Sequence, residues 1–161
     1  MNQQRPLTDA ESARLATFIA ATQAAAADWV SEELAPSTEF AAILDRWSDD
    51  WLTARIPLLP ETGGGIQGNP PHLIVAMESD AVARFAERVF AEVGKKPKAE
   101  LLPDFVAEFA NLIAGRAKAL TLGTPDHFRL GTPTPGQPPS GECLIAIING
   151  GFGKVIVALS R

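Results

Sequence analysis

Apolar residues recur at helical spacing in three stretches of the chain. The first begins at Thr8, which has the spacing of a capping box with Glu11, and Pro36 marks its end. The second spans residues 79–93, and the third spans residues 101–121. These patterns predict three helices, of which the alanine-rich first one is expected to lie across a sheet.

Shorter apolar runs, several of them with two-residue alternation, predict five strands. These runs span residues 52–59, 72–77, 126–130, 142–148 and 154–160. Pro57 lies inside the first run and indicates an edge or a bulge, because proline has no N–H group to donate. The sequence Asn149-Gly150-Gly151 is a turn signal, so the last two runs are predicted to form a hairpin.

Several segments between these runs are ambiguous or irregular. Residues 37–51 fit both helical and strand spacing, and the periodicity favours a helix. Residues 60–71 and 131–141 are rich in glycine and proline and are predicted to be loops. The glycines of the first loop lack the spacing of phosphate-binding motifs, so a connection between strands is the better interpretation. Lys95, Lys96 and Lys98 are interpreted as a solvated turn, with a contact patch for an acidic partner as the alternative.

The grouping of strands in hairpins predicts an α/β fold with a mostly antiparallel sheet and helices layered on it. The chain has 161 residues, 46% of them hydrophobic and 20% charged, which suits a globular domain with its own core. We therefore expect one domain over residues 1–161, with residues 1–7 as a polar tail.

Charge and rare residues narrow the classes of function. The net charge is −5 and no basic stripe is present, which argues against nucleic acid as a partner. Cys143 is the only cysteine, so no intrachain disulfide can form, and its apolar surroundings indicate packing. His72, His127 and Cys143 do not have the spacing of metal ligands. No signal peptide or apolar run of ~20 residues is evident, so a cytoplasmic protein without a membrane partner is expected.

A polar stripe on the third predicted helix is the main candidate for a functional site. Asp104, Glu108 and Asn111 are separated by four and three residues, and Gly115 and Lys118 continue the series. At about 100° per residue these positions share one face of a helix. The opposite face carries Phe105, Phe109, Leu112, Ile113, Ala117 and Leu120. An acid and an amide should therefore point away from the core and meet a molecule outside this chain. The plainer interpretation is an ordinary solvated helix face.

The string D-F-V-A-E-F-A-N-L-I-A-G-R-A-K-A, which begins at Asp104, resembles the phosphatase motif of the CheC/CheX/FliY family of chemotaxis proteins. The order of predicted elements from His72 to Arg161 is also similar to that family. A single copy of the motif resembles the CheX branch. Arg116 is a departure, because a small polar residue is common there in the family. Arg116 lies towards the apolar side of the helix, so it must snorkel or find a carboxylate.

The resemblance implies a CheC/CheX-like fold and an enzyme that dephosphorylates the phospho-aspartate of a CheY-like response regulator. Asn111 would orient the attacking water, since an amide can both donate to it and accept from it. Glu108 would dock on the lysine of the regulator's active site, and Asp104 would be a peripheral contact. Gly115 would let the partner backbone approach. The family needs no cofactor of its own, because Mg²⁺ is held by the regulator, and the CheX branch is dimeric.

Two hypotheses follow for the function. The first is the response-regulator phosphatase, which the Glu108 and Asn111 pair favours. The second is a non-catalytic binding module that docks a response regulator or another signalling protein. A self-contained hydrolase is disfavoured, because no Ser-His-Asp set, Cys-His set or metal site can be assembled from the sequence.

Overall fold

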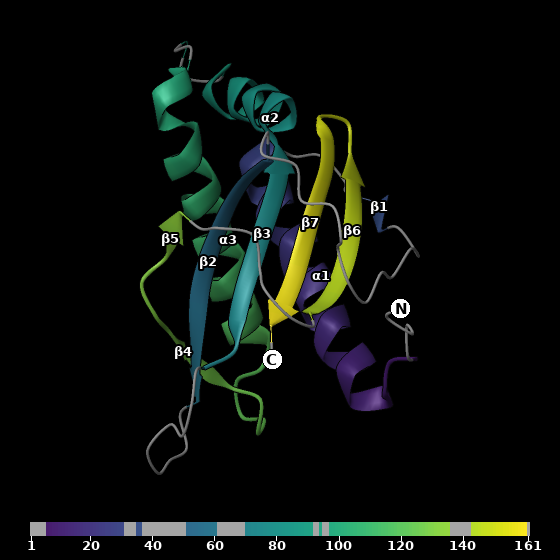
Figure 1. Cartoon of the computed structure of the whole chain (residues 1–161). Coiled ribbons are helices and arrows are strands. Elements are labelled where there is room, and N and C mark those ends of the chain that lie inside the picture. Colours follow the sequence, from purple (N-terminus) through teal and green to yellow (C-terminus); the bar gives the residue numbers. More distant parts are fainter. Residues whose placement is uncertain are drawn as a thin grey trace, which may run out of the picture.

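The computed structural model describes residues 6–30, 35–36, 51–60, 70–91, 94, 97–135 and 143–160. Its elements, shown in Figure 1, are α1 (Asp9–Val30), β1 (Ala35–Pro36), β2 (Trp51–Pro60), β3 (His72–Glu78), α2 (Ser79–Ala91), the 3₁₀ turn η1 (Ala99–Leu101), α3 (Leu102–Leu120), β4 (Phe128–Leu130), β5 (Thr134–Pro135), β6 (Cys143–Gly150) and β7 (Gly153–Ser160). The three predicted helices are therefore confirmed within these ranges, but the first does not extend to Pro36, because Ala35–Pro36 pairs with β6 as strand β1. The predictions for residues 37–50 and 61–69, and those for Lys95 and Lys96, lie outside the described residues.

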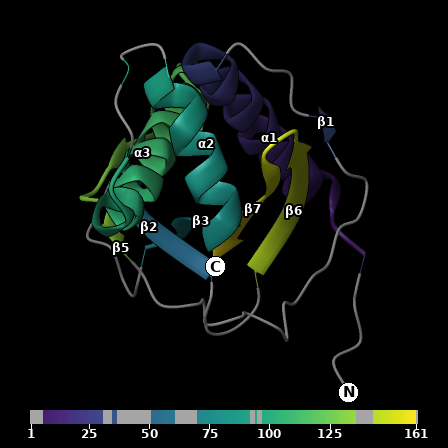
Figure 2. The same ribbon diagram turned by 90° about the horizontal axis from the view of Figure 1, so that it is seen from above.

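The described strands form one seven-stranded antiparallel sheet in the order β1-β6-β7-β3-β2-β4, with β5 also paired to β2. In Figure 2 the three α-helices lie together on one face of this sheet. The predicted fold class, a mostly antiparallel sheet with helices layered on it, is confirmed. No helix within the described ranges is long and apolar enough to span a membrane.

The start of α1 shows the predicted capping box. The Thr8 backbone N–H donates to Glu11 Oε1 at 2.9 Å, and the Glu11 N–H donates to Thr8 Oγ1 at 3.1 Å. These two bonds satisfy N–H groups that have no partner within the helix. The only polar interruption of the buried stripe of α1 is Thr22, whose hydroxyl donates to the Phe18 carbonyl at 2.7 Å.

Pro57 lies inside β2 at a position where its missing N–H is tolerated. The neighbouring Leu58 N–H donates towards β3, to the Pro71 carbonyl, so the N side of residue 57 faces the opposite edge. On that side of β2, β5 pairs with β2 as far as Arg55, and the pairing with β4 begins at Leu58. Pro57 lies between these two paired segments. β2 is thus paired on both of its sides, so the predicted edge position was wrong, and Pro57 is tolerated because its ring nitrogen lies between the segments that pair with β5 and β4.

Three predicted boundaries were wrong in detail. The predicted loop at residues 131–141 contains β5, because β4 leaves part of the β2 edge open for pairing. The predicted strand at residues 126–130 begins only at Phe128, after a turn. The hairpin of β6 and β7 is confirmed, but its turn is formed by Gly151 and Phe152, because Gly150 pairs with Gly153.

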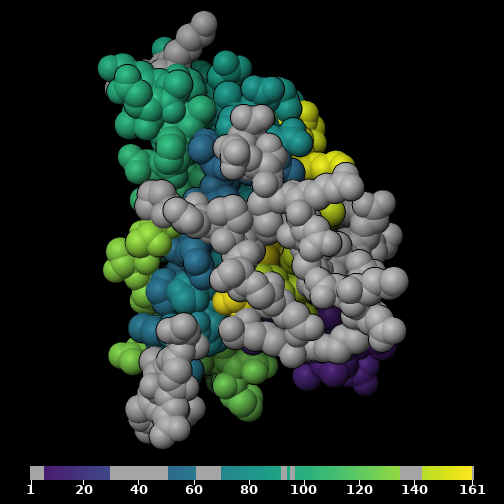
Figure 3. Space-filling view, in the orientation of Figure 1, coloured from purple at the N-terminus to yellow at the C-terminus, as the bar shows by residue number. Residues whose placement is uncertain are grey.

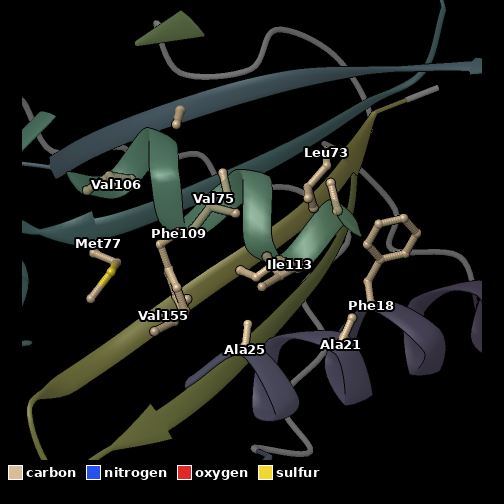
Figure 4. Packing of buried hydrophobic residues seen from close by; sticks show 14 of the residues in the cluster. Phe18, Ala21, Ala25, Leu73, Val75, Met77, Val106, Phe109, Ile113 and Val155 are labelled. Atoms are coloured by element: carbon tan, nitrogen blue, oxygen red, sulfur yellow. The ribbon is translucent and has the colours of Figure 1, made fainter. Parts of the chain in front are cut away.

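The main core fills the space between the helices and the sheet. Figure 4 shows Val106, Phe109 and Ile113 of α3 between Phe18, Ala21 and Ala25 of α1 and the sheet residues Leu73, Val75, Met77 and Val155. At one end, Trp29 of α1 contacts the rings of Phe85, Phe105 and Phe109, with centroid distances of 5.7, 4.8 and 5.5 Å. This packing fixes the position of α3 relative to the other two helices.

Candidate functional site on helix α3

Helix α3 has one fully buried side and one side that faces outwards. Pro103 is accommodated in its first turn, where an N–H group would have no partner in the helix. The helix packs on α1, α2, β2 and β3. Its buried residues are Phe105, Val106, Phe109, Ala110, Ile113, Ala114 and Ala117. Because this set follows the helical period, the stripe of Asp104, Glu108 and Asn111 is turned away from the core.

The structure confirms the predicted orientation of this stripe. Asp104, Glu108 and Gly115 are exposed, whereas Asn111 is half-buried. Within the described residues, no hydrogen bond or ion pair engages the side chains of Asp104, Glu108 or Asn111. The acid groups and the amide are thus presented to solvent or to a partner. Their roles stay predictions, because exposure alone is compatible with an ordinary helix face.

Gly115 is not required by packing within the chain. Apart from the neighbouring residues and backbone of its own helix, no atom of the described residues lies within 4 Å of the position that a Cβ would occupy there. A glycine in a helix interior is destabilising by roughly 0.5–1 kcal/mol relative to alanine. The described structure gives no internal reason for this cost, which is consistent with close approach of a partner at this turn.

Arg116 is explained by a contact with α1. Its guanidinium forms an ion pair with the Asp28 carboxylate, and both side chains are 49% exposed. The expectation that Arg116 would find a carboxylate is confirmed. The pair joins α3 to α1 and does not involve the polar stripe, so this departure from the family motif leaves the candidate site unobstructed.

An apolar groove lies beside the first half of the stripe and was not predicted from the sequence. It has a volume of about 430 Å³ and is lined by Trp29, Val89, Phe90, Pro97, Leu101, Leu102, Asp104, Phe105 and Glu108. We call it the α2–α3 groove. Figure 3 shows atoms of α2 and of the beginning of α3 at the upper end of the molecule. The sequence offered one signal for the groove, the large apolar residue Leu101 at the start of the predicted third helix. The structure leaves this side chain 52% exposed.

The titratable groups with perturbed pKa values lie away from this stripe. Burial lowers the pKa of Arg14, opposed by the nearby Asp126 carboxylate. Burial and the charge of Arg55 lower the pKa of His72, whereas burial raises the pKa of the Cys143 thiol. In the described part of the chain, no three His, Cys, Asp or Glu residues are grouped as a metal site would need. Asp104, Glu108 and Asn111 offer two carboxylates and an amide, with no hydroxyl or thiol nucleophile among them.

Comparison with known proteins shows which solved structures have a similar fold. No protein-family model matches the chain, and no curated protein does. Solved structures of chemotaxis proteins, however, have the same fold along nearly the whole chain. A CheC-like superfamily protein from Shewanella sp. PV-4 has a TM-score of 0.71 at 18% identity, covering 95% of this chain and 98% of that one.

CheX structures have the same fold. The chemotaxis protein CheX from Vibrio vulnificus has a TM-score of 0.70 at 17% identity, covering 92% of this chain and 98% of that one. A complex of CheX with CheY, BeF₃ and Mg²⁺ from Borrelia burgdorferi has a TM-score of 0.66 at 17% identity, covering 91% and 96%. The chain has the CheC/CheX-like fold, as the motif resemblance implied.

Proposed function

We propose that this protein is a phosphatase that accelerates the loss of phosphate from the phospho-aspartate of a CheY-like response regulator. The observation that carries the proposal is the outward-facing pair of Glu108 and Asn111 on α3, in a chain with the CheC/CheX-like fold. One structure of similar fold is a CheX protein in complex with CheY, BeF₃ and Mg²⁺, which supports a partner of this kind.

The chemistry requires little from the phosphatase beyond positioning. The attacking water forms a new bond to phosphorus while the bond from phosphorus to the aspartyl oxygen breaks. The products are the free carboxylate of the regulator and inorganic phosphate, which takes up both protons of the water as H₂PO₄⁻. Mg²⁺ on the regulator would neutralise the phosphoryl oxygens, so the phosphatase needs no cofactor of its own.

Asn111 is the residue proposed to position the water. A carboxamide accepts a hydrogen bond through its oxygen and donates one through its nitrogen, whereas a carboxylate only accepts. The half-buried position of Asn111 limits the number of side-chain conformations, which suits an orienting role. Glu108, one turn earlier, is proposed to dock on the active-site lysine of the regulator. Asp104 and Gly115 are proposed as further partner contacts.

A second candidate function is a non-catalytic module that docks a response regulator or another signalling protein through the same face. The α2–α3 groove favours it, because an apolar groove beside exposed acids can bind a partner without any catalysis. A homodimer stays a prediction from the resemblance to the CheX branch.

The two functions are separated by measuring phosphate release from phosphorylated CheY-like receiver domains of the same genome, with Mg²⁺ present. We expect the wild-type protein to accelerate release and Asn111→Ala to abolish nearly all of that acceleration. Each tenfold loss in rate corresponds to ~1.4 kcal/mol of barrier. Glu108→Ala should weaken binding, whereas Glu87→Ala, which changes an exposed glutamate on α2, is the matched control.

The catalytic proposal is wrong if Asn111→Ala and Glu108→Ala both dephosphorylate the regulator at the wild-type rate. If the wild-type protein binds the regulator without accelerating phosphate release, the binding-module function is supported instead. Unchanged binding in both variants would exclude this face of α3 as the docking surface.

A further inference from the structure

The α2–α3 groove has an unusual composition for an open surface. Trp29, Val89, Phe90 and Phe105 give it an apolar floor, and the largely exposed Leu101 lies at its margin. Removing apolar surface from water stabilises a protein by roughly 25 cal/mol per Å². Large apolar side chains that stay in contact with water forgo this stabilisation. A groove of this kind therefore favours an apolar occupant.

The charges of the groove restrict what the occupant can be. Asp104 and Glu108 contribute carboxylates, and no basic group occurs among its described lining residues. An apolar group with a positive charge beside it is complementary to this lining, whereas an acidic group is not. The volume of about 430 Å³ is sufficient for one or more large side chains.

Glu108 connects the groove to the candidate site. It belongs both to the polar stripe of α3 and to the lining of the groove, whereas Asn111 belongs to the stripe alone. The two residues are one helical turn apart. Any protein that contacts both Glu108 and Asn111 must therefore lie directly beside the groove.

We propose that the α2–α3 groove is a second docking point for the response regulator and that it binds an apolar side chain next to a basic group on the regulator's surface. This inference rests on the proposed function for the identity of the partner. It adds that the groove and Asn111 have different roles in binding and in catalysis. The groove contributes to the affinity for the regulator, whereas Asn111 determines the rate after binding.

The test uses two exposed leucines, Leu101 immediately before α3 and Leu120 at its last position. Leu101→Gln removes an apolar contact from the groove, and Leu120→Gln is the matched control, because Leu120 is 57% exposed and does not line the groove. Both leucines are largely exposed, so neither change should unfold the protein. Leu101→Met keeps the apolar character and should retain binding. Circular dichroism checks the helix content of each variant.

Binding is measured by titrating the full chain with each CheY-like receiver domain of the same genome, loaded with Mg²⁺ and BeF₃⁻. We expect Leu101→Gln to raise the Kd about tenfold, the size typical of losing one important interface side chain. Leu120→Gln and Leu101→Met should bind as the wild type does. The rate of phosphate release at saturating protein should be the same for all four proteins.

The groove proposal is overturned if Leu101→Gln and Leu120→Gln bind equally well, or if Leu101→Gln slows phosphate release at saturation without changing the Kd. Binding that depends on Leu101 but gives no acceleration would support the groove and contradict the phosphatase. Acceleration of phosphate release that depends on Asn111, together with binding that does not depend on Leu101, would support the phosphatase and contradict the groove. If none of the receiver domains binds, both proposals fail.

Discussion

Three residues of the polar stripe differ in the constraint that the fold places on them. Asp104 is exposed in the first turn of α3, where the helix dipole alone accounts for an acid. Glu108 is exposed one turn later and also lines the α2–α3 groove. Asn111 is half-buried and is therefore less accessible to solvent than the two acids. The residue with the strictest geometric role in the proposed chemistry is therefore also the least exposed of the three.

Gly115 gives a prediction in which stability and binding change in opposite directions. Gly115→Ala should raise the free energy of unfolding by roughly 0.5–1 kcal/mol, because alanine favours a helix and its Cβ would clash with none of the other described elements. The same methyl group should weaken binding of the BeF₃⁻-loaded regulator, since it occupies space next to Asn111. Urea denaturation and titration measure the two effects. A variant that is more stable and binds normally would exclude a contact at Gly115.

At the scale of elements, two contacts with α1 help to hold α3 in place. The Trp29 end of α1 packs against Phe85 of α2 and Phe105 of α3, and the Arg116 ion pair with Asp28 joins α1 to α3. Both contacts lie outside the polar stripe. The outward face of α3 is therefore left open, while its position is set by contacts on its other sides.

The ion pair of Arg116 and Asp28 should contribute little to stability. Both side chains are half-exposed, and exposed pairs typically contribute about 0–1 kcal/mol because water and salt screen them. A double-mutant cycle with Asp28→Ala and Arg116→Ala, measured by urea denaturation, should give a coupling energy within that range. Phosphate release should stay at the wild-type rate in both single variants. A loss of activity in Arg116→Ala would indicate that Arg116 belongs to the functional face.

At the scale of the whole molecule, the sheet is apolar on both faces. The helices cover one face with the main core, and a second buried cluster on the strands contains Ile74, Ala76, Cys143, Ile145, Ile156 and Ala158. β3 and β7 contribute residues to both clusters and lie at the centre of the sheet. Such strands are expected to open only when the whole domain unfolds.

Cys143, the first residue of β6, tests whether the strand next to β7 also opens only when the whole domain unfolds. Its side chain is 4% exposed, and burial raises the pKa of its thiol, so little thiolate is accessible at neutral pH. Alkylation by iodoacetamide should be slow in the native protein. In urea, the onset of labelling should coincide with the loss of circular dichroism. Rapid labelling without urea would show that β6 opens separately from the rest of the sheet.

Local interactions determined much of what could be predicted. The capping box of Thr8 and Glu11 depends on a spacing of three residues, and the face of α3 depends only on the helical period. The strands of the β6 and β7 hairpin are likewise set by neighbouring residues. The sequence by itself thus determined the helices, most strands, the fold class and the candidate residues Asp104, Glu108, Asn111 and Gly115.

Contacts between distant segments decided the rest. Arg116 is paired with Asp28 of another helix, and β5 forms only because the β2 edge is open beside β4. The α2–α3 groove needs Trp29, Phe90 and Leu101 from three separate segments, so no local pattern contains it. Periodicity specifies which way a side chain points from its own helix. What it meets there depends on how the helices and strands pack in three dimensions.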